Sequence, residues 1–210
     1  PKPLGSIVKN PAYATTMRRI AADGPPGAWG QEGADFLAAA KRGGVSSLIT
    51  AADLSGYQAQ PRESLCAPFL VYSVCSMAPP SFGGVVVLQV LQMLEARNPP
   101  SAPAKRFDFD DPDFVHYFAE SGRLAQADRL HYVGDPAFSN VPTQALVARS
   151  YLQERARIIA PGRVTRELTP GDFERKAASL PEAVQVLDAP SADATSQMAI
   201  VDRHGNALPM

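Results

Sequence analysis

The chain has 210 residues, 45% of them hydrophobic and 20% charged, which is the composition of a folded globular protein rather than a disordered one. Its 20 lysines and arginines nearly balance its 21 aspartates and glutamates, and the net charge of -1 argues against binding to nucleic acid or to an anionic membrane surface. The sequence has no apolar run long enough to span a membrane. Its 20 prolines predict short elements with sharply defined ends.

Three helices are predicted in the first part of the chain, over residues 11–23, 32–42 and 51–56. Asn10 and Pro11 are typical of an N-cap and a first helical position, and Gly24 is typical of a helix end. Thr50 and Asp53 have the spacing of a capping box, in which the shorter Asp replaces the usual Glu. These signals define the helix ends better than the helix interiors.

The middle of the chain predicts strands followed by a buried helix. Residues 65–77 are rich in Val, Tyr, Phe and Leu and are interrupted by Pro68, which predicts a hairpin or two short strands. Residues 85–96 predict a helix that is apolar on most sides and therefore buried. Gly83 and Gly84 precede this helix, but no Lys-Ser or Lys-Thr follows them, so we expect close backbone packing rather than a phosphate-binding loop.

The second half of the chain predicts further helices and ends in strands. The helices cover residues 112–132, 142–160 and 170–173, and the strands cover residues 197–202 and 207–208 on either side of a turn. The long helix has Asp111 as its N-cap, and one broad face carries Phe114, Phe118, Leu124, Ala125 and His131. Because the last strand has hardly begun when the chain stops, we infer that the chain is part of a longer protein.

Histidines and cysteines are the first candidates for chemistry. His116 and His131 lie on one predicted helix about four turns apart, so they cannot share a metal ion, and His204 lies in a turn. Cys66 and Cys75 are too few for a disulfide scaffold or a zinc site. They are either two reduced thiols in a core or strand or, in an exported protein, a single bridge.

Thr195 is a further candidate, although residue types alone give it an ordinary role. It follows the small, acidic residues 188–194 and stands at the start of the last strand pair. Threonine is common in strands, so without other information Thr195 is a strand residue.

Five segments, in order and over nearly the whole chain, resemble the γ-glutamyltranspeptidase family. They are residues 5–25, residues 48–57, the turn from Met77 to Gly84, Ala127-Asp128-Arg129 with Tyr132-Val133-Gly134-Asp135-Pro136, and residues 195–207. The chain departs from the family pattern at Thr195-Ser196-Gln197, where Thr-Thr-His is usual, and at Ala78 and Phe82 in the proline-rich turn. These departures leave Thr195 intact and bear on substrate preference.

The resemblance implies a two-subunit enzyme of the N-terminal-nucleophile hydrolase class. The precursor cuts itself at the Ala194–Thr195 bond, and Thr195 becomes both the new N-terminus and the nucleophile. Residues 1–194 then correspond to the later part of the large subunit and residues 195–210 to the first strands of the small one. The implied fold is α+β, a mostly helical piece with a few strands that belongs to an αββα sandwich in the parent protein.

The chemistry of an N-terminal threonine fits this role. A threonine hydroxyl needs an adjacent base, and cleavage of the Ala194–Thr195 bond frees an α-amino group whose reference pKa is about 7.7–8.0. By resemblance, Thr195 attacks the γ-amide of glutathione or a related γ-glutamyl compound, and water or an amino-acid or peptide acceptor releases the ester. No metal or organic cofactor is implied.

The resemblance also implies a partner and a compartment. The remaining part of the precursor supplies the carboxylate-binding Arg and the oxyanion donors, so we expect residues 1–210 alone to be uncut and inactive. A periplasmic or secreted location is implied, with the cytoplasm as the alternative. Two rival functions remain: a cephalosporin-type acylase that uses Thr195, and a non-catalytic helical module in which Thr195 is only a strand residue.

Overall fold

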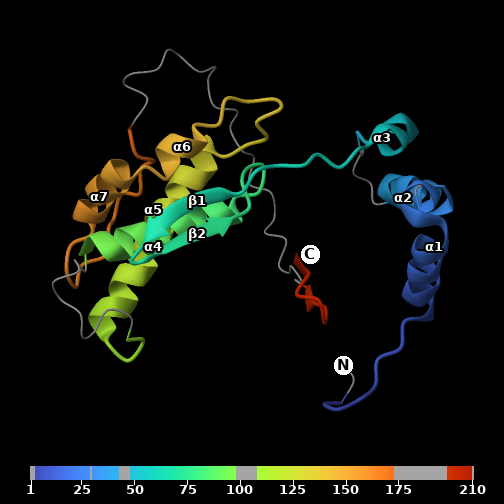
Figure 1. Ribbon diagram of the computed structural model, residues 1–210, viewed down its shortest axis with the longest axis horizontal. Helices are drawn as coiled ribbons and strands as arrows, with labels where there is room; N and C mark the ends of the chain where they lie inside the picture. Colours follow the sequence, from blue (N-terminus) through green and yellow to red (C-terminus); the bar gives the residue numbers. More distant parts are fainter. Residues whose placement is uncertain (1–2, 29, 43–47, 98–107, 173–197, 210) are drawn as a thin grey trace. The chain divides into compact units, whose positions relative to one another are not determined.

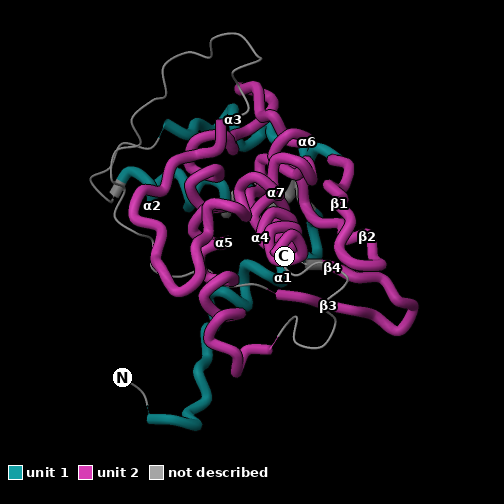
Figure 2. The backbone as a smooth tube through the Cα atoms, turned by 90° about the vertical axis from the view of Figure 1, so that its left-hand side faces the viewer, with its two compact units in different colours: residues 1–61 teal, residues 62–210 magenta. Residues whose placement is uncertain are grey.

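The computed structural model describes residues 3–28, 30–42, 48–97, 108–172 and 198–209 (Figure 1). Helices predominate in these residues, and the strands form two separate hairpins, so the expected α+β class is confirmed. The chain divides into two compact units, Pro1–Pro61 and Arg62–Met210 (Figure 2). None of the described helices is long and apolar enough to cross a membrane.

The described residues of the first unit form three helices with the predicted starts. They are α1 (Pro11–Ala28), α2 (Gln31–Arg42) and α3 (Ala51–Gly56). Asn10 Oδ1 accepts a hydrogen bond from the Tyr13 amide, and Gly24 interrupts α1 with φ of 67°, although a further helical turn follows it. The side chains of Thr50 and Asp53 each accept a hydrogen bond from the other's amide, which confirms the capping box.

The second unit begins with the predicted hairpin. Strands β1 (Leu65–Phe69) and β2 (Tyr72–Ser76) are antiparallel, and Phe69 pairs with Tyr72. Pro68 lies inside β1 and does not interrupt it. The Cα atoms of Cys66 and Cys75 are only 4.0 Å apart, which is typical of a pair that exchanges no backbone hydrogen bonds. Because the two types of pair alternate along the ladder, Pro68, two residues after Cys66, also lies in a pair without backbone hydrogen bonds. The missing proline N–H therefore costs the ladder nothing.

Helix α4 (Gly83–Arg97) is the centre of the second unit, as its apolar sequence predicts. It contacts β1 and β2, which run across it in Figure 1, and also helices α5 (Pro112–Tyr132), α6 (Thr143–Leu146) and α7 (Arg149–Ile158). Val85 and Met93 on α4 are fully buried. One stripe of α4 remains open, where Val86, Val90 and Phe118 line an apolar groove of about 580 Å³ beside α5.

Two groups of buried side chains meet on α4. One consists of Val90, Met93, Leu94, Phe114, Leu124, Ala125, Tyr151, Leu152, Ala156 and Ile159. The other consists of Leu65, Ala67, Val85, Leu88, Tyr132, Leu146 and Val147. The hairpin, α5 and the last two helices of the unit are thus assembled around one buried helix.

Helix α5 has the predicted ends, and its predicted face is buried only in part. Asp111 caps it by accepting a hydrogen bond from the Asp113 amide at 3.0 Å. The rings of Phe114 and Phe118 are 6.3 Å apart, as expected for one face, although Phe118 is 46% exposed and His131 is also exposed. The buried residues of the helix also include Asp128, whose carboxylate is satisfied by polar groups from other elements.

The structure corrects two further predictions after α5. The single helix expected over residues 142–160 is divided into α6 and α7 between Leu146 and Arg149. Gln89 and Gln92 of α4 donate their side-chain amides to the carbonyls of Leu146 and Val147, at 2.9 and 3.0 Å, and so satisfy groups that the break leaves without helical partners.

The short helix expected from Pro170 to Phe173 is the second correction. Residues 169–172 are neither helix nor strand, and Phe173 lies outside the described residues. The Thr169 carbonyl and the Gly171 amide bind to Arg155 and Asp128, respectively. The backbone therefore bonds to other elements rather than to itself.

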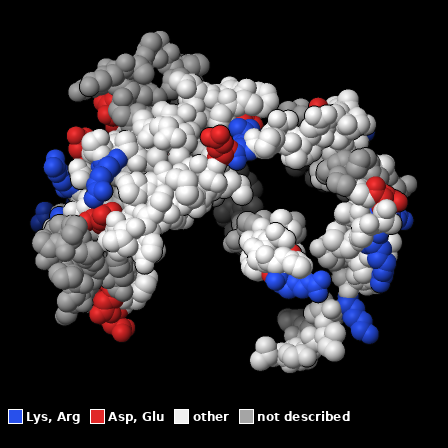
Figure 3. Space-filling view, viewed as in Figure 1, with Lys and Arg blue, Asp and Glu red and all other residues white. Residues whose placement is uncertain are grey.

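Charged side chains of both signs are scattered over the face of the molecule that Figure 3 shows. Several are paired within the second unit: Glu95 with Arg149 at 3.1 Å, and Arg62 with Asp135 at 3.3 Å. Both members of the Arg62–Asp135 pair are partly exposed, and such pairs contribute little to stability.

Gly84 tests the close packing at the start of α4. A Cβ atom at this position would lie 2.1 Å from the Met77 carbonyl oxygen, and a backbone atom cannot easily move away. We expect Gly84→Ala to lower the free energy of unfolding by roughly 1–3 kcal/mol in urea denaturation. Gly122→Ala in α5 is the control, because no atom beyond its chain neighbours and its own helix backbone lies within 4 Å of the added Cβ, and it should stabilise the protein by about 0.5–1 kcal/mol. Equal effects of the two variants would contradict this explanation.

Candidate functional site

The predicted nucleophile Thr195 and the predicted cleavage bond Ala194–Thr195 lie outside the described residues. The described chain resumes at Met198, and β3 (Ala199–Val201) begins four residues after Thr195. Strand β3 pairs with β4 (Ala207–Pro209), which confirms the predicted strands and the turn between them. Thr195 therefore precedes a regular hairpin by a few residues, as the sequence predicts.

Asp202 organises the turn of this hairpin. Its carboxylate accepts hydrogen bonds from the amides of His204 and Asn206, at 2.8 and 2.9 Å, and from the Asn206 side chain at 2.8 Å. Gly205 has φ of 83°, a conformation that favours glycine. Hydrogen bonds from Asn206 hold the pKa of Asp202 below its usual value. The turn following β3 is thus held by an ionised carboxylate.

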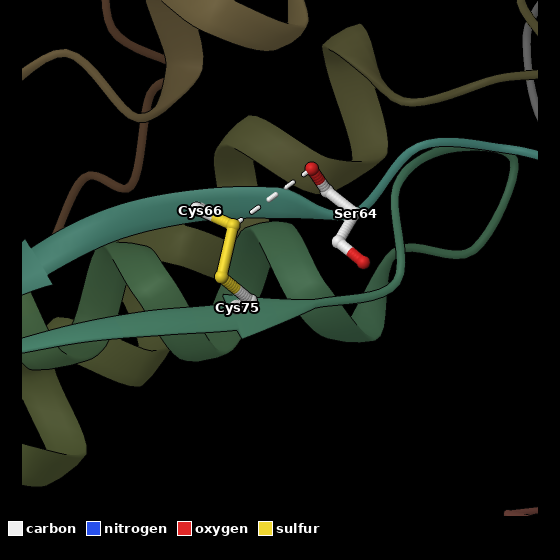
Figure 4. Close-up of a disulfide and its surroundings, with 3 residues drawn as sticks. All are labelled: Ser64, Cys66 and Cys75. Carbon is white, nitrogen blue, oxygen red and sulfur yellow. Dashed lines mark hydrogen bonds between the residues drawn. A yellow bond between two sulfur atoms is a disulfide. The ribbon is translucent and has the colours of Figure 1, made fainter.

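The two cysteines form a disulfide across β1 and β2 (Figure 4). The sequence left two possibilities open, and the structure favours the bridge over reduced thiols. Both half-cystines lie on the exposed face of the hairpin, and the carbonyl of Ser64 is 4.0 Å from Cys66 Sγ. Leu65 and Ala67, which alternate with Cys66, lie on the buried face.

A buried polar cluster that was not among the sequence-based candidates lies in the second unit. Asp128 is fully buried, and its two carboxylate oxygens accept four hydrogen bonds. The donors are Gln89 Nε2 at 3.1 Å, the Tyr151 hydroxyl at 2.6 Å, Arg155 Nη2 at 2.9 Å and the Gly171 amide at 2.9 Å. Burial raises the pKa of the Tyr151 phenol, and its hydrogen bond to Asp128 raises it further.

One signal in the sequence could have identified this cluster. Asp128 lies four residues after Leu124 and four before Tyr132, so it belongs to the same face of α5 as two core residues. A carboxylate on a buried face needs hydrogen-bond donors from other elements. The donors themselves are 23 to 43 residues away and could not be chosen from the sequence.

The histidines have separate environments, as expected. A ring nitrogen of His116 lies 2.9 Å from the Ala160 carbonyl, and the His131 ring packs edge-on against Tyr132. His204 is exposed beside Arg203. In the parts of the chain that the structure describes, no three His, Cys, Asp or Glu side chains gather where they could hold a metal ion.

The turn after β3 should respond to acid. The pKa of Asp202 is lowered in the folded state. The ionised carboxylate therefore stabilises the turn at neutral pH, and this stabilisation is lost as the pH falls through that pKa. We expect the amide proton shifts of His204 and Asn206 to titrate together with the Asp202 carboxyl in an NMR pH series. In Asp202→Asn the same shifts should stay flat over that range, and amide shifts that ignore the titration of Asp202 would contradict the assignment.

Comparisons with known proteins extend over the whole chain. The family model described as Gamma-glutamyltranspeptidase matches residues 1–210. The glutathione hydrolase proenzyme of Escherichia coli (strain K12) is 31% identical over 99% of this chain and 33% of its own length. The Acylase ACY 1 proenzyme of Pseudomonas sp. (strain V22) is 36% identical over 70% of this chain and 25% of its own.

A solved structure agrees with these matches. The crystal structure of Helicobacter pylori gamma-glutamyltranspeptidase matches this chain with a TM-score of 0.67 and 28% sequence identity. The match covers 84% of this chain and 49% of the H. pylori chain. The chain spans a quarter to a third of the length of the curated relatives named above. Because the family model matches all 210 residues, the chain belongs to the gamma-glutamyltranspeptidase family.

Proposed function

We propose that the whole protein transfers or hydrolyses γ-glutamyl groups, with Thr195 as the nucleophile after self-cleavage of the Ala194–Thr195 bond. The observation that carries this proposal is the family match over residues 1–210, in which Thr195 stands just before the β3–β4 hairpin. A relative at 31% identity is named a glutathione hydrolase proenzyme, and a proenzyme implies a processing step of the kind we propose.

The proposed chemistry uses one hydroxyl twice. In the precursor, the Thr195 hydroxyl attacks the carbonyl of Ala194, and water opens the resulting ester. The freed α-amino group then accepts the hydroxyl proton while Thr195 attacks the γ-amide of glutathione or a related compound. The amine leaves with a proton, and water or an amino-acid or peptide acceptor attacks the γ-glutamyl ester to regenerate Thr195.

The proposal assigns the chain a place in a larger protein. Residues 1–194 belong to the large subunit and residues 195–210 to the small one, a processing boundary that differs from the packing boundary at Pro61. Because the chain spans only a part of its relatives, the remaining precursor supplies the other strands of the αββα sandwich and the oxyanion donors, and residues 1–210 alone are inactive. An oxidising compartment, periplasmic or extracellular, fits the exposed Cys66–Cys75 bridge.

A second candidate function uses the same nucleophile on a different substrate. The Acylase ACY 1 proenzyme is 36% identical over 70% of this chain, a higher identity over a shorter stretch than the glutathione hydrolase of E. coli. Hydrolysis of a cephalosporin side-chain amide by Thr195 is therefore the alternative. The non-catalytic module has no observation in its favour.

The nucleophile is tested in the full-length protein. Thr195→Ala should abolish both self-cleavage and turnover, because the missing hydroxyl attacks in both steps. Intact-mass spectrometry measures the first and release of p-nitroaniline from γ-glutamyl-p-nitroanilide the second. Ser196→Ala removes the neighbouring hydroxyl and should still yield two subunits. Two subunits from the Thr195→Ala precursor would show that another residue makes the cut.

The substrate class is tested with the matured wild-type protein. We expect a kcat/KM for glutathione at least tenfold above that for a cephalosporin carrying an acidic acyl side chain, since the γ-glutamyl proposal places the substrate's α-amino and α-carboxylate groups in binding contacts. Liquid chromatography of the released products measures both reactions. The reverse ranking would favour the acylase alternative.

A further inference from the structure

The Cys66–Cys75 bridge lies on the outer side of the first hairpin, away from the core. Both half-cystines are exposed, while Leu65 and Ala67, on either side of Cys66 in β1, are buried. Figure 4 shows the bridge joining the two strands, with helices behind them. A reagent in solution therefore reaches the two sulfur atoms without any movement of the core.

The side chains beside the bridge on this outer face are small and uncharged. Because successive side chains of a strand point to opposite faces, Pro68 shares the face of Cys66, and Ser73 shares the face of Cys75. Pro68 and Ser73 are exposed and form the next outward pair of the ladder. Neither strand contains a charged residue. The two strands therefore neither cover the bridge nor repel the negatively charged thiolate that attacks a disulfide.

The hairpin is attached to the second unit by its other face. Leu65 and Ala67 belong to the buried group that contains Val85 and Leu88 of α4, and Val74 packs against the same group. None of these contacts involves a sulfur atom. They therefore remain when the bridge is open, and burial of the inner face keeps the hairpin on α4.

The backbone ladder also remains when the bridge is open. The Cys66–Cys75 pair exchanges no backbone hydrogen bonds, and the two types of pair alternate along the ladder. The hydrogen-bonded pairs are therefore the two that flank the bridge, Leu65 with Ser76 and Ala67 with Val74. Breaking the bond between the sulfur atoms thus removes one cross-link and leaves the pairing on both sides of it in place.

We propose that the Cys66–Cys75 bridge is a reversible site of thiol–disulfide exchange, at which a dithiol opens the bridge while the second unit stays folded. A thiolate of the dithiol attacks one half-cystine sulfur, the bond between the two protein sulfurs breaks, and the other cysteine leaves as a thiolate. The second thiol of the dithiol attacks the mixed disulfide and releases the first cysteine. Two electrons pass to the bridge, the two thiol protons end on the cysteines, and the dithiol becomes a disulfide. This inference does not depend on the proposed role of Thr195.

The first test measures access to the bridge in the full-length protein, with dithiothreitol as the dithiol. Free thiols are trapped with N-ethylmaleimide at successive times, and peptide mass spectrometry locates the labels at Cys66 and Cys75. We expect the rate of reduction in native buffer to be within about tenfold of the rate in urea, because attack on an exposed sulfur needs no unfolding. Reduction that had to wait for global unfolding would be at least about 10³-fold slower than in urea. A native rate below the tenfold limit would overturn the inference.

The second test asks whether the unit stays folded without the bridge. The double variant Cys66→Ser/Cys75→Ser is compared with Leu65→Ser, which places the same side chain on the buried face of β1. Hydrogen exchange of α4 peptides, followed by mass spectrometry in the full-length protein, should stay slow in the double variant and become fast in Leu65→Ser. Loss of protection in the double variant equal to that in Leu65→Ser would show that the bridge holds the fold, and would overturn the inference.

Two dithiols distinguish a small reagent from a protein. Dithiothreitol needs access only to the sulfur atoms, whereas reduced thioredoxin has to dock on the outer face of the hairpin. Reduction by both would support a site open to protein dithiols, and reduction by dithiothreitol alone would support a site for small ones. After removal of the reductant, oxidised glutathione should close the bridge again. Failure of both dithiols, or of reclosure, would overturn the inference.

Discussion

The buried carboxylate of Asp128 is the constraint on which the second unit depends. An ionised carboxylate without hydrogen bonds is too costly to bury, so its four donors have to be in place together. Gln89 donates from α4, and Tyr151 and Arg155 donate from α7. The fourth donor is the Gly171 amide, in the irregular segment after α7. If any of these elements moved away, the buried Asp128 carboxylate would lose a hydrogen-bond donor. Apolar packing around α4 supplies the driving force for burial, and the hydrogen bonds of Asp128 join α4, α5, α7 and Gly171 at one point.

Local signals in the sequence predict the helix starts, the two hairpins and the burial of α4, because each depends on residues that are neighbours along the chain. Thr50 with Asp53 and Asp111 with Asp113 are pairs of this kind. The break between α6 and α7 could not be predicted, since the carbonyls that it frees are bound by glutamines more than 50 residues earlier. The same holds for residues 169–172, where Pro170 suggests a helix start but Asp128 and Arg155 bind the backbone.

The candidate site divides in the same way. Thr195 was predicted from a resemblance spread over five segments, and it stays a prediction because it lies outside the described residues. Asp128 and Tyr132 were part of that resemblance, yet their contacts with Arg155 and Gly171 are seen only in the structure. The motif therefore contains residues of two kinds: one that performs the proposed chemistry and others that determine where the backbone runs. Sequence similarity alone does not distinguish them.

The Cys66–Cys75 bridge has a consequence for the register of the first hairpin. Side chains of a strand alternate between faces, so a slip of one residue in the β1–β2 pairing would move Leu65 and Ala67 from the core to solvent. The bridge joins directly opposed residues and thus excludes every slipped register. Only nine positions separate the two cysteines, so this check on register requires no distant part of the chain. The register of the surface on which α4 packs is therefore fixed within the hairpin itself, without any contact from α5 or α7.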